Sequence, residues 1–203
     1  MPGRWKNLRY LPKYLQERIS PQLGDEQPWL NYELVSFLKH QPRGWVVEFG
    51  SGRSTMWLAS QGFFVFSTEH DRKWANHVSV ALQRRNLVTQ VDYNLIDLNS
   101  GPSQAFDIYL RPFVDKKLPE QPVLVLVDGL FRPECLRACA GLVAHGTQLI
   151  LHDADREEYQ RTVADLKSCS HIETRVIYGP GHGTPDFTWA LIFFKKTFDE
   201  NPN

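Results

Sequence analysis

Apolar runs of strand length alternate with amphipathic stretches along most of this chain. Seven such runs are rich in β-branched and aromatic residues, and the fourth, Val123–Val127, is apolar at every position, as expected of a strand buried on both faces. This alternation favours a mainly parallel sheet with helices packed on both faces. The predicted strands are Trp45–Phe49, Phe63–Thr68, Val91–Ile96, Val123–Val127, Gln148–Leu151, Thr174–Tyr178 and Thr188–Phe194.

Helical spacing separates most of these strands. A first helix is predicted from Leu30 to Leu38, and Pro42 ends its pattern. Only residues 179–187 separate the last two strands, so these must be antiparallel, because a parallel connection needs a longer crossover. We therefore predict an α/β fold, a Rossmann-like three-layer sandwich with a mostly parallel seven-stranded sheet and an antiparallel last strand. The other predicted helices are Thr55–Ser60, Lys73–Arg84, Pro133–Val143 and Glu157–Lys167.

A glycine loop follows the first predicted strand. Residues 48–55 read Glu-Phe-Gly-Ser-Gly-Arg-Ser-Thr. In a doubly wound sheet this turn lies where ligands bind, and Gly50 and Gly52 remove Cβ atoms where backbone and ligand come close. Ser54 or Thr55 can cap the next helix. A dinucleotide site normally has glycine at the position of Thr55, so the loop favours a nucleoside without pyrophosphate over NAD.

Glu69 ends the second predicted strand, about 20 residues beyond the loop, where a carboxylate can bind both hydroxyls of a ribose. An acid, then Gly-x-Gly, then an acid ending strand two resembles the class I S-adenosylmethionine-dependent methyltransferases. The resemblance implies S-adenosylmethionine as cofactor and the sheet order 3-2-1-4-5-7-6. Asp97 or the nearby Asp92 would border the adenine. The implied cofactor-binding residues are Glu48, Gly50, Ser51, Gly52, Ser54, Glu69 and Asp97.

Two further strands end in acids, Asp128 after the fourth and Asp153 after the fifth. At one edge of a sheet, two carboxylates can hold a hard divalent cation, which would orient an acceptor hydroxyl and lower its pKa. His152, or an acid not bound to the metal, can then take the proton. Alternatively, the acids cap helices or pair with Arg132 and Arg156, and both interpretations can hold together.

This arrangement resembles metal-dependent O-methyltransferases such as catechol O-methyltransferase and the macrocin-type sugar methyltransferases. Asp128 and Asp153 match their magnesium ligands after strands four and five. Ala154 replaces the next expected ligand, so the third would be Asp155 or His152. The His-Asp-Ala-Asp-Arg segment also resembles glucuronoxylan O-methyltransferases. The resemblance implies Mg²⁺ or Mn²⁺ at Asp128, Asp153 and Asp155, with Asp128, His152 and Asp153 catalytic, and a small-molecule or carbohydrate acceptor.

Arg132 and His182 are candidate substrate contacts, the latter in a glycine- and proline-rich loop. Lys plus Arg and Asp plus Glu each number 23, so no positive field is expected to attract nucleic acid. Three cysteines and no apolar run of about 18 residues predict a cytoplasmic protein without a membrane span. We predict that residues 1–27 form a basic and aromatic arm and that residues 28–203 form a single methyltransferase domain. The oligomeric state stays open, with a homodimer as one alternative.

Three other functions compete with O-methylation. A non-catalytic S-adenosylmethionine-binding or interaction module can retain the same fold. A NAD-dependent oxidoreductase is disfavoured by Thr55. Methylation of nucleic acid bases is disfavoured because Asp128 is followed by Gly-Leu-Phe, whereas the base methyltransferases carry an Asn/Asp-Pro-Pro-aromatic segment there.

Overall fold

The fold is described from a computed structural model of the chain. The structure describes residues 12, 15, 27–98, 104–181 and 187–195. The predicted arm at residues 1–27 lies almost entirely outside these ranges, as does His182, one of the two predicted substrate contacts. Across the described ranges, every helix is too short or too polar to cross a lipid bilayer.

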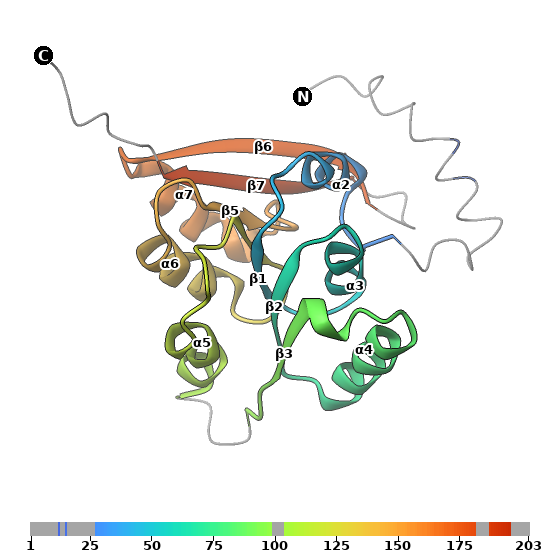
Figure 1. Cartoon of the computed structure of the whole chain (residues 1–203). Helices are drawn as coiled ribbons and strands as arrows, with labels where there is room; N and C mark the ends of the chain where they lie inside the picture. Colours follow the sequence, from blue (N-terminus) through green and yellow to red (C-terminus); the bar gives the residue numbers. More distant parts are fainter. Residues whose placement is uncertain (1–11, 13–14, 16–26, 99–103, 182–186, 196–203) are drawn as a thin grey trace, which may run out of the picture.

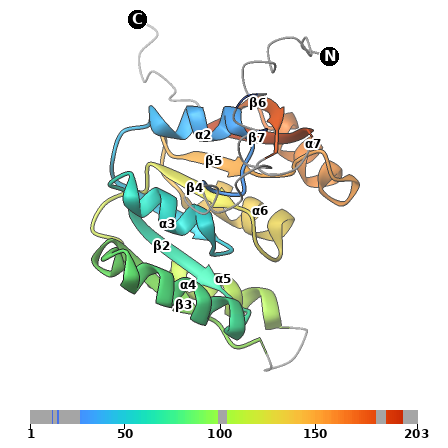
Figure 2. The ribbon, with the colours of Figure 1, turned by 90° about the vertical axis from the view of Figure 1, so that its right-hand side faces the viewer.

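One seven-stranded sheet has the order β3-β2-β1-β4-β5-β7-β6. The pairs among β1 to β5 are parallel, whereas β7 is antiparallel to both β5 and β6. In Figure 2, β6 and β7 lie at the top of the sheet and β3 at the bottom. The predicted order and the antiparallel final hairpin are confirmed. The strands are β1 (Trp45–Phe49), β2 (Phe64–Glu69), β3 (Val91–Leu95), β4 (Leu124–Val127), β5 (Gln148–Leu151), β6 (Ile172–Pro180) and β7 (Phe187–Lys195).

Helices cover both faces of the sheet, which gives the three predicted layers (Figure 1). Helices α2, α3 and α4 lie on one face, and α5, α6 and α7 lie on the other. Neighbouring residues of a strand point to opposite faces of the sheet. Val46 therefore packs in the core under α2, α3 and α4, and Val47 packs in the core under α5, α6 and α7. The helices are α2 (Tyr32–Lys39), α3 (Arg53–Ser60), α4 (Arg72–Arg84), α5 (Ala105–Asp115), α6 (Arg132–Leu142) and α7 (Gln160–Ser168).

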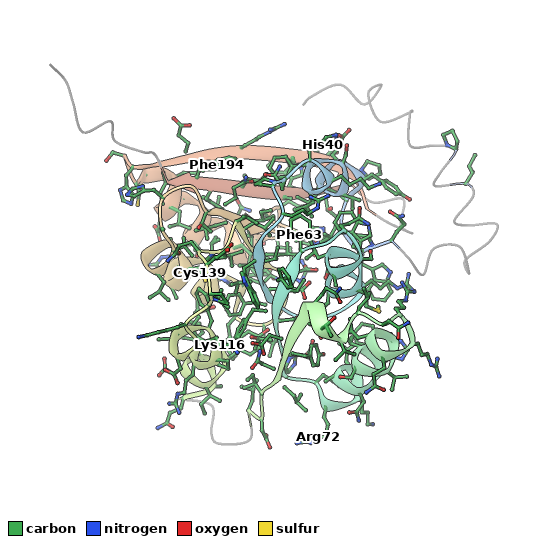
Figure 3. The ribbon with its side chains drawn as sticks, viewed as in Figure 1. His40, Phe63, Arg72, Lys116, Cys139 and Phe194 are labelled. Atoms are coloured by element: carbon green, nitrogen blue, oxygen red, sulfur yellow. The ribbon has the colours of Figure 1, made fainter. Side chains whose placement is uncertain are left out.

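Side chains fill the space between each helical layer and the sheet (Figure 3). Cys135 and Cys139 lie one turn apart on α6, and both are fully buried in the core that contains Val125. Burial raises the pKa of Cys139 to about 12, so this thiol stays neutral at physiological pH. The two cysteines are therefore core side chains.

Helix α5 is not predicted from the sequence. Pro112 lies inside it, where proline removes a backbone donor and is unfavourable. Packing offsets this cost: Tyr109 is fully buried, and Phe113 packs edge-on against Phe49 with ring centroids 6.0 Å apart. The helix thus forms because its aromatic face fills the core, although its local sequence disfavours it.

The strand order reverses between β1 and β4, where doubly wound sheets bind their ligands. There the loops after the two strands touch: Gly50 has a φ of 96°, and a Cβ on it would lie 2.4 Å from Cα of Gly129. The Gly129 backbone is therefore a sufficient reason for glycine at position 50. Gly52 differs, because its φ of 171° suits any residue and a Cβ would meet Trp74 at an ordinary 3.7 Å.

Candidate active site

A cavity of about 940 Å³ lies at the carboxyl ends of β1, β2, β4 and β5. Its volume falls in the range of small-ligand sites, roughly 300 to 1,000 Å³. One half is formed by the glycine loop and the end of β2, and the other by the ends of β4 and β5. The predicted site residues that line it are Gly50, Ser51, Gly52, Ser54, Glu69, Asp128, Arg132, His152 and Asp153.

Glu48 lies behind the glycine loop and is fully buried. Its Oε2 accepts hydrogen bonds from the hydroxyls of Thr55 and Ser67, while Oε1 is buried without a hydrogen-bond partner among the described residues. Burial raises the pKa of Glu48 to about 7, although the hydroxyl donors oppose this shift. Thr55 Oγ1 also accepts from the backbone N of Gly52 at 2.8 Å, so it connects the loop to Glu48.

Glu69 lines the cavity, but protein donors already engage its carboxylate. Oε1 accepts from the backbone N of His70 at 2.8 Å and of Asp71 at 2.9 Å. Oε2 accepts from both N and Oγ of Ser51 at 3.1 Å. A ribose needs the same acceptor atoms, and Ser51 Oγ can leave Oε2 because it also contacts the hydroxyl of Tyr93 at 2.5 Å. Glu69 can therefore accept a sugar hydroxyl in place of Ser51.

Two tryptophans line the cavity that are absent from the predicted site. Trp74, in the first turn of α4, donates from Nε1 to the carbonyl of Ser51 at 2.7 Å. Its ring stacks on Trp29 with centroids 6.2 Å apart, and the Arg53 guanidinium lies 4.8 Å above Trp29. The sequence feature that could have identified Trp74 is its position just after strand two, at the sheet edge that also carries the glycine loop.

Three acids considered in the sequence analysis lie outside the cavity. Asp97 follows β3 with a side chain 58% exposed, and its alternative, Asp92, pairs with Lys116. Asp155 is exposed and accepts a hydrogen bond from the backbone N of Trp189 at 3.3 Å. Contact with adenine for Asp97 and metal binding for Asp155 remain predictions.

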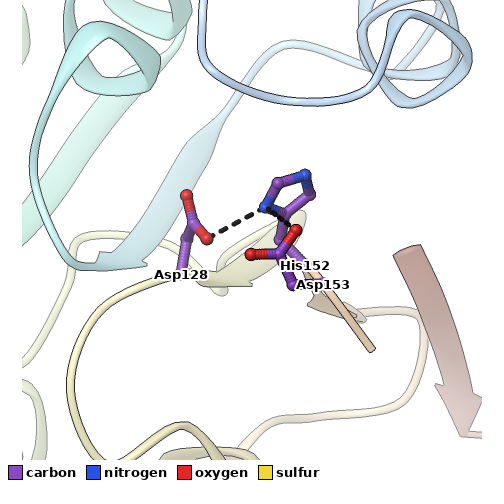
Figure 4. Close-up of side chains that lie close together, drawn as sticks. All are labelled: Asp128, His152 and Asp153. Atoms are coloured by element: carbon purple, nitrogen blue, oxygen red, sulfur yellow. Dashed lines mark hydrogen bonds and ion pairs between the residues drawn. The ribbon is translucent and has the colours of Figure 1, made fainter. Parts of the chain in front are cut away.

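Asp128, His152 and Asp153 form the core of the other half (Figure 4). Nδ1 of His152 lies 3.0 Å from Oδ1 of Asp128 and 3.4 Å from Oδ1 of Asp153. An ionised carboxylate can only accept, so Nδ1 carries a proton and Nε2 of the neutral ring has a lone pair. Nε2 is buried and has no hydrogen-bond partner in the described part of the chain. A buried ring nitrogen without a partner is rare, and its lone pair can accept a hydrogen bond from a donor group on a ligand.

The surrounding charges shift the pKa values of His152 and Asp153. Burial acts to lower the pKa of His152, but the carboxylates of Asp128 and Asp153 outweigh it and raise the pKa above its ordinary value. Burial acts to raise the pKa of Asp153, but His152 and the guanidinium groups of Arg132 and Arg156 bring it below its usual range. His152 therefore binds a proton more readily than an exposed histidine does.

Arg132 contacts both acids. Its Nη1 lies 3.0 Å from Oδ1 of Asp128, 3.5 Å from Oδ2 of Asp153 and 3.0 Å from the carbonyl of His152. Arg156 adds a second cation, with Nη2 at 2.7 Å from Oδ2 of Asp153. The sequence analysis left open whether Asp128 and Asp153 pair with Arg132 and Arg156. The structure contains these pairs.

The turns after β4 and β5 both hold a non-glycine residue in the left-handed region. Phe131 has a φ of 51° and Asp153 a φ of 52°. Such conformations cost about 1–3 kcal/mol and persist where packing holds them, as where Phe131 meets Tyr109 at a centroid distance of 5.7 Å. The turns bring Arg132 and Asp153 to the cavity wall.

A divalent cation does not fit this half while the side chains stand as they do. The donor atoms of Asp128, His152 and Asp153 lie within 4.8 Å of one another, close enough for one ion. However, Nδ1 of His152 already donates to Asp128, and Arg132 contacts both carboxylates. A cation bound through Nδ1 would have to displace that proton, and a cation at the two carboxylates would be repelled by the guanidinium.

The glycine-loop half does fit a nucleoside. Glu69 and Ser51 offer hydroxyl acceptors at the cavity wall, and Trp74 offers an aromatic face beside them. The cavity reaches from these residues to His152 without a break, so one elongated ligand can extend from the first half toward the second. S-adenosylmethionine, an adenosine with a methionine chain attached, is an elongated ligand of this kind.

The sequence matches no protein-family model and no curated protein. Solved structures nevertheless align along most of the chain. An O-methyltransferase from Bacillus cereus in complex with SAH aligns with a TM-score of 0.63 and 17% identity over 97% of this chain and 93% of that chain. The O-methyltransferase TomG from Streptomyces achromogenes, involved in tomaymycin synthesis and in complex with SAM, has a TM-score of 0.61 and 16% identity over 81% and 78%.

A precorrin-6Y C5,15-methyltransferase from Geobacter metallireducens also aligns, with a TM-score of 0.58 and 12% identity over 81% of this chain and 86% of that chain. All three proteins are methyltransferases, although the reactions in their names differ. Identities of 12 to 17% make the likeness one of fold. Together with the sheet order and the cavity at its switch point, they establish that this chain has the class I S-adenosylmethionine-dependent methyltransferase fold.

Proposed function

We propose that this protein is an S-adenosylmethionine-dependent methyltransferase that methylates a hydroxyl oxygen of a small molecule or carbohydrate. The observation that carries the proposal is one cavity with the glycine loop and Glu69 on one side and the Asp128–His152 pair on the other. Methyl transfer requires cofactor and acceptor to meet in line in a single enclosed space. The cavity supplies such a space, with hydroxyl acceptors on one side and a base on the other.

The glycine-loop half binds the cofactor in this proposal. S-adenosylmethionine supplies a methyl group that its sulfonium centre makes electrophilic. Glu69 accepts from the ribose hydroxyls when Ser51 Oγ turns to Tyr93. Gly50 and Gly52 contribute backbone to the wall of the cavity, and Gly50 lets the loop lie against Gly129. Glu48 acts from behind, through Thr55, by holding the loop in shape.

His152 takes the proton of the acceptor hydroxyl. Asp128 accepts the hydrogen bond from Nδ1–H, so the lone pair of Nε2 faces the hydroxyl. The hydroxyl then supplies the hydrogen-bond donor that Nε2 lacks among the described residues. As the new C–O bond forms and the C–S bond breaks, the hydroxyl proton passes to Nε2. The products are the methyl ether and S-adenosylhomocysteine, and Asp128 stabilises the imidazolium that results.

The test has two steps. Calorimetric titration with S-adenosylhomocysteine measures binding, and an assay with methyl-labelled S-adenosylmethionine measures transfer to a panel of phenols, polyols and sugars. We expect binding by the wild type and by His152→Gln, and transfer at least about 10²-fold slower in the variant. His145→Gln is a matched control, because His145 is exposed and precedes β5 at its opposite end.

Each competing function gives a different result. A non-catalytic module of the same fold binds S-adenosylhomocysteine but transfers the methyl group to no acceptor. A NAD-dependent oxidoreductase binds NAD and ignores S-adenosylhomocysteine. Equal transfer rates for the wild type and His152→Gln would contradict the assignment of the base while leaving the cofactor assignment intact.

A further inference from the structure

We propose that Arg132 is the permanent cation of this site and occupies the place between the two acids that a divalent metal would otherwise take. One consequence, methyl transfer without a metal, rests on the proposed function. The cation site itself can be tested without turnover.

Arg132 is held between the turns after β4 and β5. Nε donates to the carbonyl of Gly129 at 3.1 Å, and Nη1 donates to the carbonyl of His152 at 3.0 Å. These bonds place Nη1 at 3.0 Å from Asp128 and 3.5 Å from Asp153, and the side chain is only 12% exposed. A guanidinium with several acceptors around its fixed fork of donors is stabilised by each of them.

Each acid in this half already has a cation against it. Asp128 and Asp153 contribute two negative charges, and Arg132 and Arg156 contribute two positive charges at contact distance, with the exposed Glu158 at 4.0 Å from Arg156 on the outer side. Magnesium and calcium sites instead use carboxylates to neutralise the ion itself. A divalent ion added here would leave an excess of positive charge in a partly buried site, which is unfavourable. The structure therefore assigns the neutralising role to arginine.

This makes Arg132 a positioning residue for the proposed reaction. It fixes the Oδ1 atom of Asp128 that also accepts from His152, so it helps to set the orientation of the imidazole. It touches no reacting atom in the proposed mechanism.

Manganese binding tests the inference directly. Mn²⁺ is titrated into the apo protein, and the free ion is followed by electron paramagnetic resonance. We expect the wild type to bind Mn²⁺ more weakly than about 1 mM, in the range of the weakest protein sites for divalent cations. Arg132→Met removes the cation and leaves Asp128, His152 and Asp153 open, so we expect Mn²⁺ to bind at least about tenfold more tightly.

Two matched variants identify the cause. Arg132→Lys keeps a positive charge and should continue to exclude Mn²⁺, although a lysine lacks the fork of donors. Arg137→Met removes an exposed arginine of the same helix, which lies 3.5 Å from Asp165, and should bind Mn²⁺ as the wild type does. Thermal unfolding of every variant verifies that it is folded.

The opposite results overturn the inference. Tight stoichiometric Mn²⁺ binding by the wild type contradicts it, whether or not a methyl acceptor has been found. So does equal Mn²⁺ affinity of the wild type and a folded Arg132→Met, or Mn²⁺ binding by Arg132→Lys as tight as by Arg132→Met. Once an acceptor is known, we expect chelation with EDTA to change the rate by less than about twofold, and a loss restored by Mn²⁺ would contradict the inference.

Discussion

The two halves of the cavity hold their carboxylates in different ways. On the glycine-loop side, Glu48 is held by hydroxyl groups, and Glu69 by Ser51, by backbone N–H groups and by Nδ1 of His70 at 2.9 Å. On the other side, Asp128 and Asp153 are held by arginine and histidine. Hydroxyl and backbone donors predominate in the first half, whereas two guanidinium groups contact the carboxylates of the second. The two halves should therefore differ in their response to mutation, pH and salt.

The largest difference should appear in catalysis. His152→Gln removes the proposed base and should lower kcat by about 10²- to 10⁴-fold, the usual contribution of general base catalysis, with little change in S-adenosylhomocysteine affinity. Glu69→Gln should instead weaken S-adenosylhomocysteine binding, because an amide presents one acceptor oxygen where the carboxylate presents two. Calorimetry and steady-state kinetics on both variants measure the contrast. A loss of cofactor affinity in His152→Gln as large as in Glu69→Gln would merge the two halves into one functional unit.

The junction between the halves should show the next largest effect. Gly50→Ala places a Cβ at 2.4 Å from Cα of Gly129 and in a disfavoured backbone region, so we expect a loss of about 4 kcal/mol in unfolding free energy. Gly52→Ala is the matched control, since its Cβ meets Trp74 at 3.7 Å in extended backbone. Urea unfolding compares them. Similar stabilities for the two variants would mean that the loops separate easily.

Much of the fold could be predicted because its elements are encoded in local patterns. Trp45–Phe49 and Gln148–Leu151 agree with the observed strands to the residue, since each is a short, mainly apolar run. Helix α5 could not be predicted in the same way, because Pro112 contradicts its helical pattern and only burial of residues such as Tyr109 stabilises it. Tertiary packing here outweighs local propensity.

The site shows the same limit at the level of side chains. The positions of Asp128 and Asp153 could be predicted, because parallel strands bring their ends to one edge of the sheet. The bridging role of Arg132 could not, since it depends on the left-handed turn at Phe131 and on the direction of a long side chain. The link from Trp74 to the glycine loop likewise depends on a contact between distant residues.

The pH dependence of stability should reveal the buried carboxyl group of Glu48, which belongs to the glycine-loop half, with an effect of about 3 kcal/mol. The pKa of Glu48 rises from 4.5 to about 7 on folding, so the folded state binds this proton more tightly, and stability falls as pH rises between these values. Glu48→Gln cannot titrate and resembles the protonated side chain. Relative to the wild type, the variant should therefore gain about 3 kcal/mol between pH 4 and pH 8. Urea unfolding at the two pH values measures this gain, and a constant difference would contradict the buried, neutral state of Glu48.

The smallest expected effects are the sharpest test of the contrast between neutral and charged halves. Trp74→Phe removes the hydrogen bond to Ser51 and should cost about 1 kcal/mol at any salt concentration. Arg156→Gln removes a half-exposed ion pair with Asp153 and should cost less than about 1 kcal/mol, with a loss that shrinks as salt screens the charges. Unfolding at low and high NaCl measures both variants. If the loss of stability caused by Trp74→Phe also shrinks with salt, charge contributes to the stability of the glycine-loop half. The distinction between the two halves then fails, because neutral hydrogen bonds are not what organises the loop.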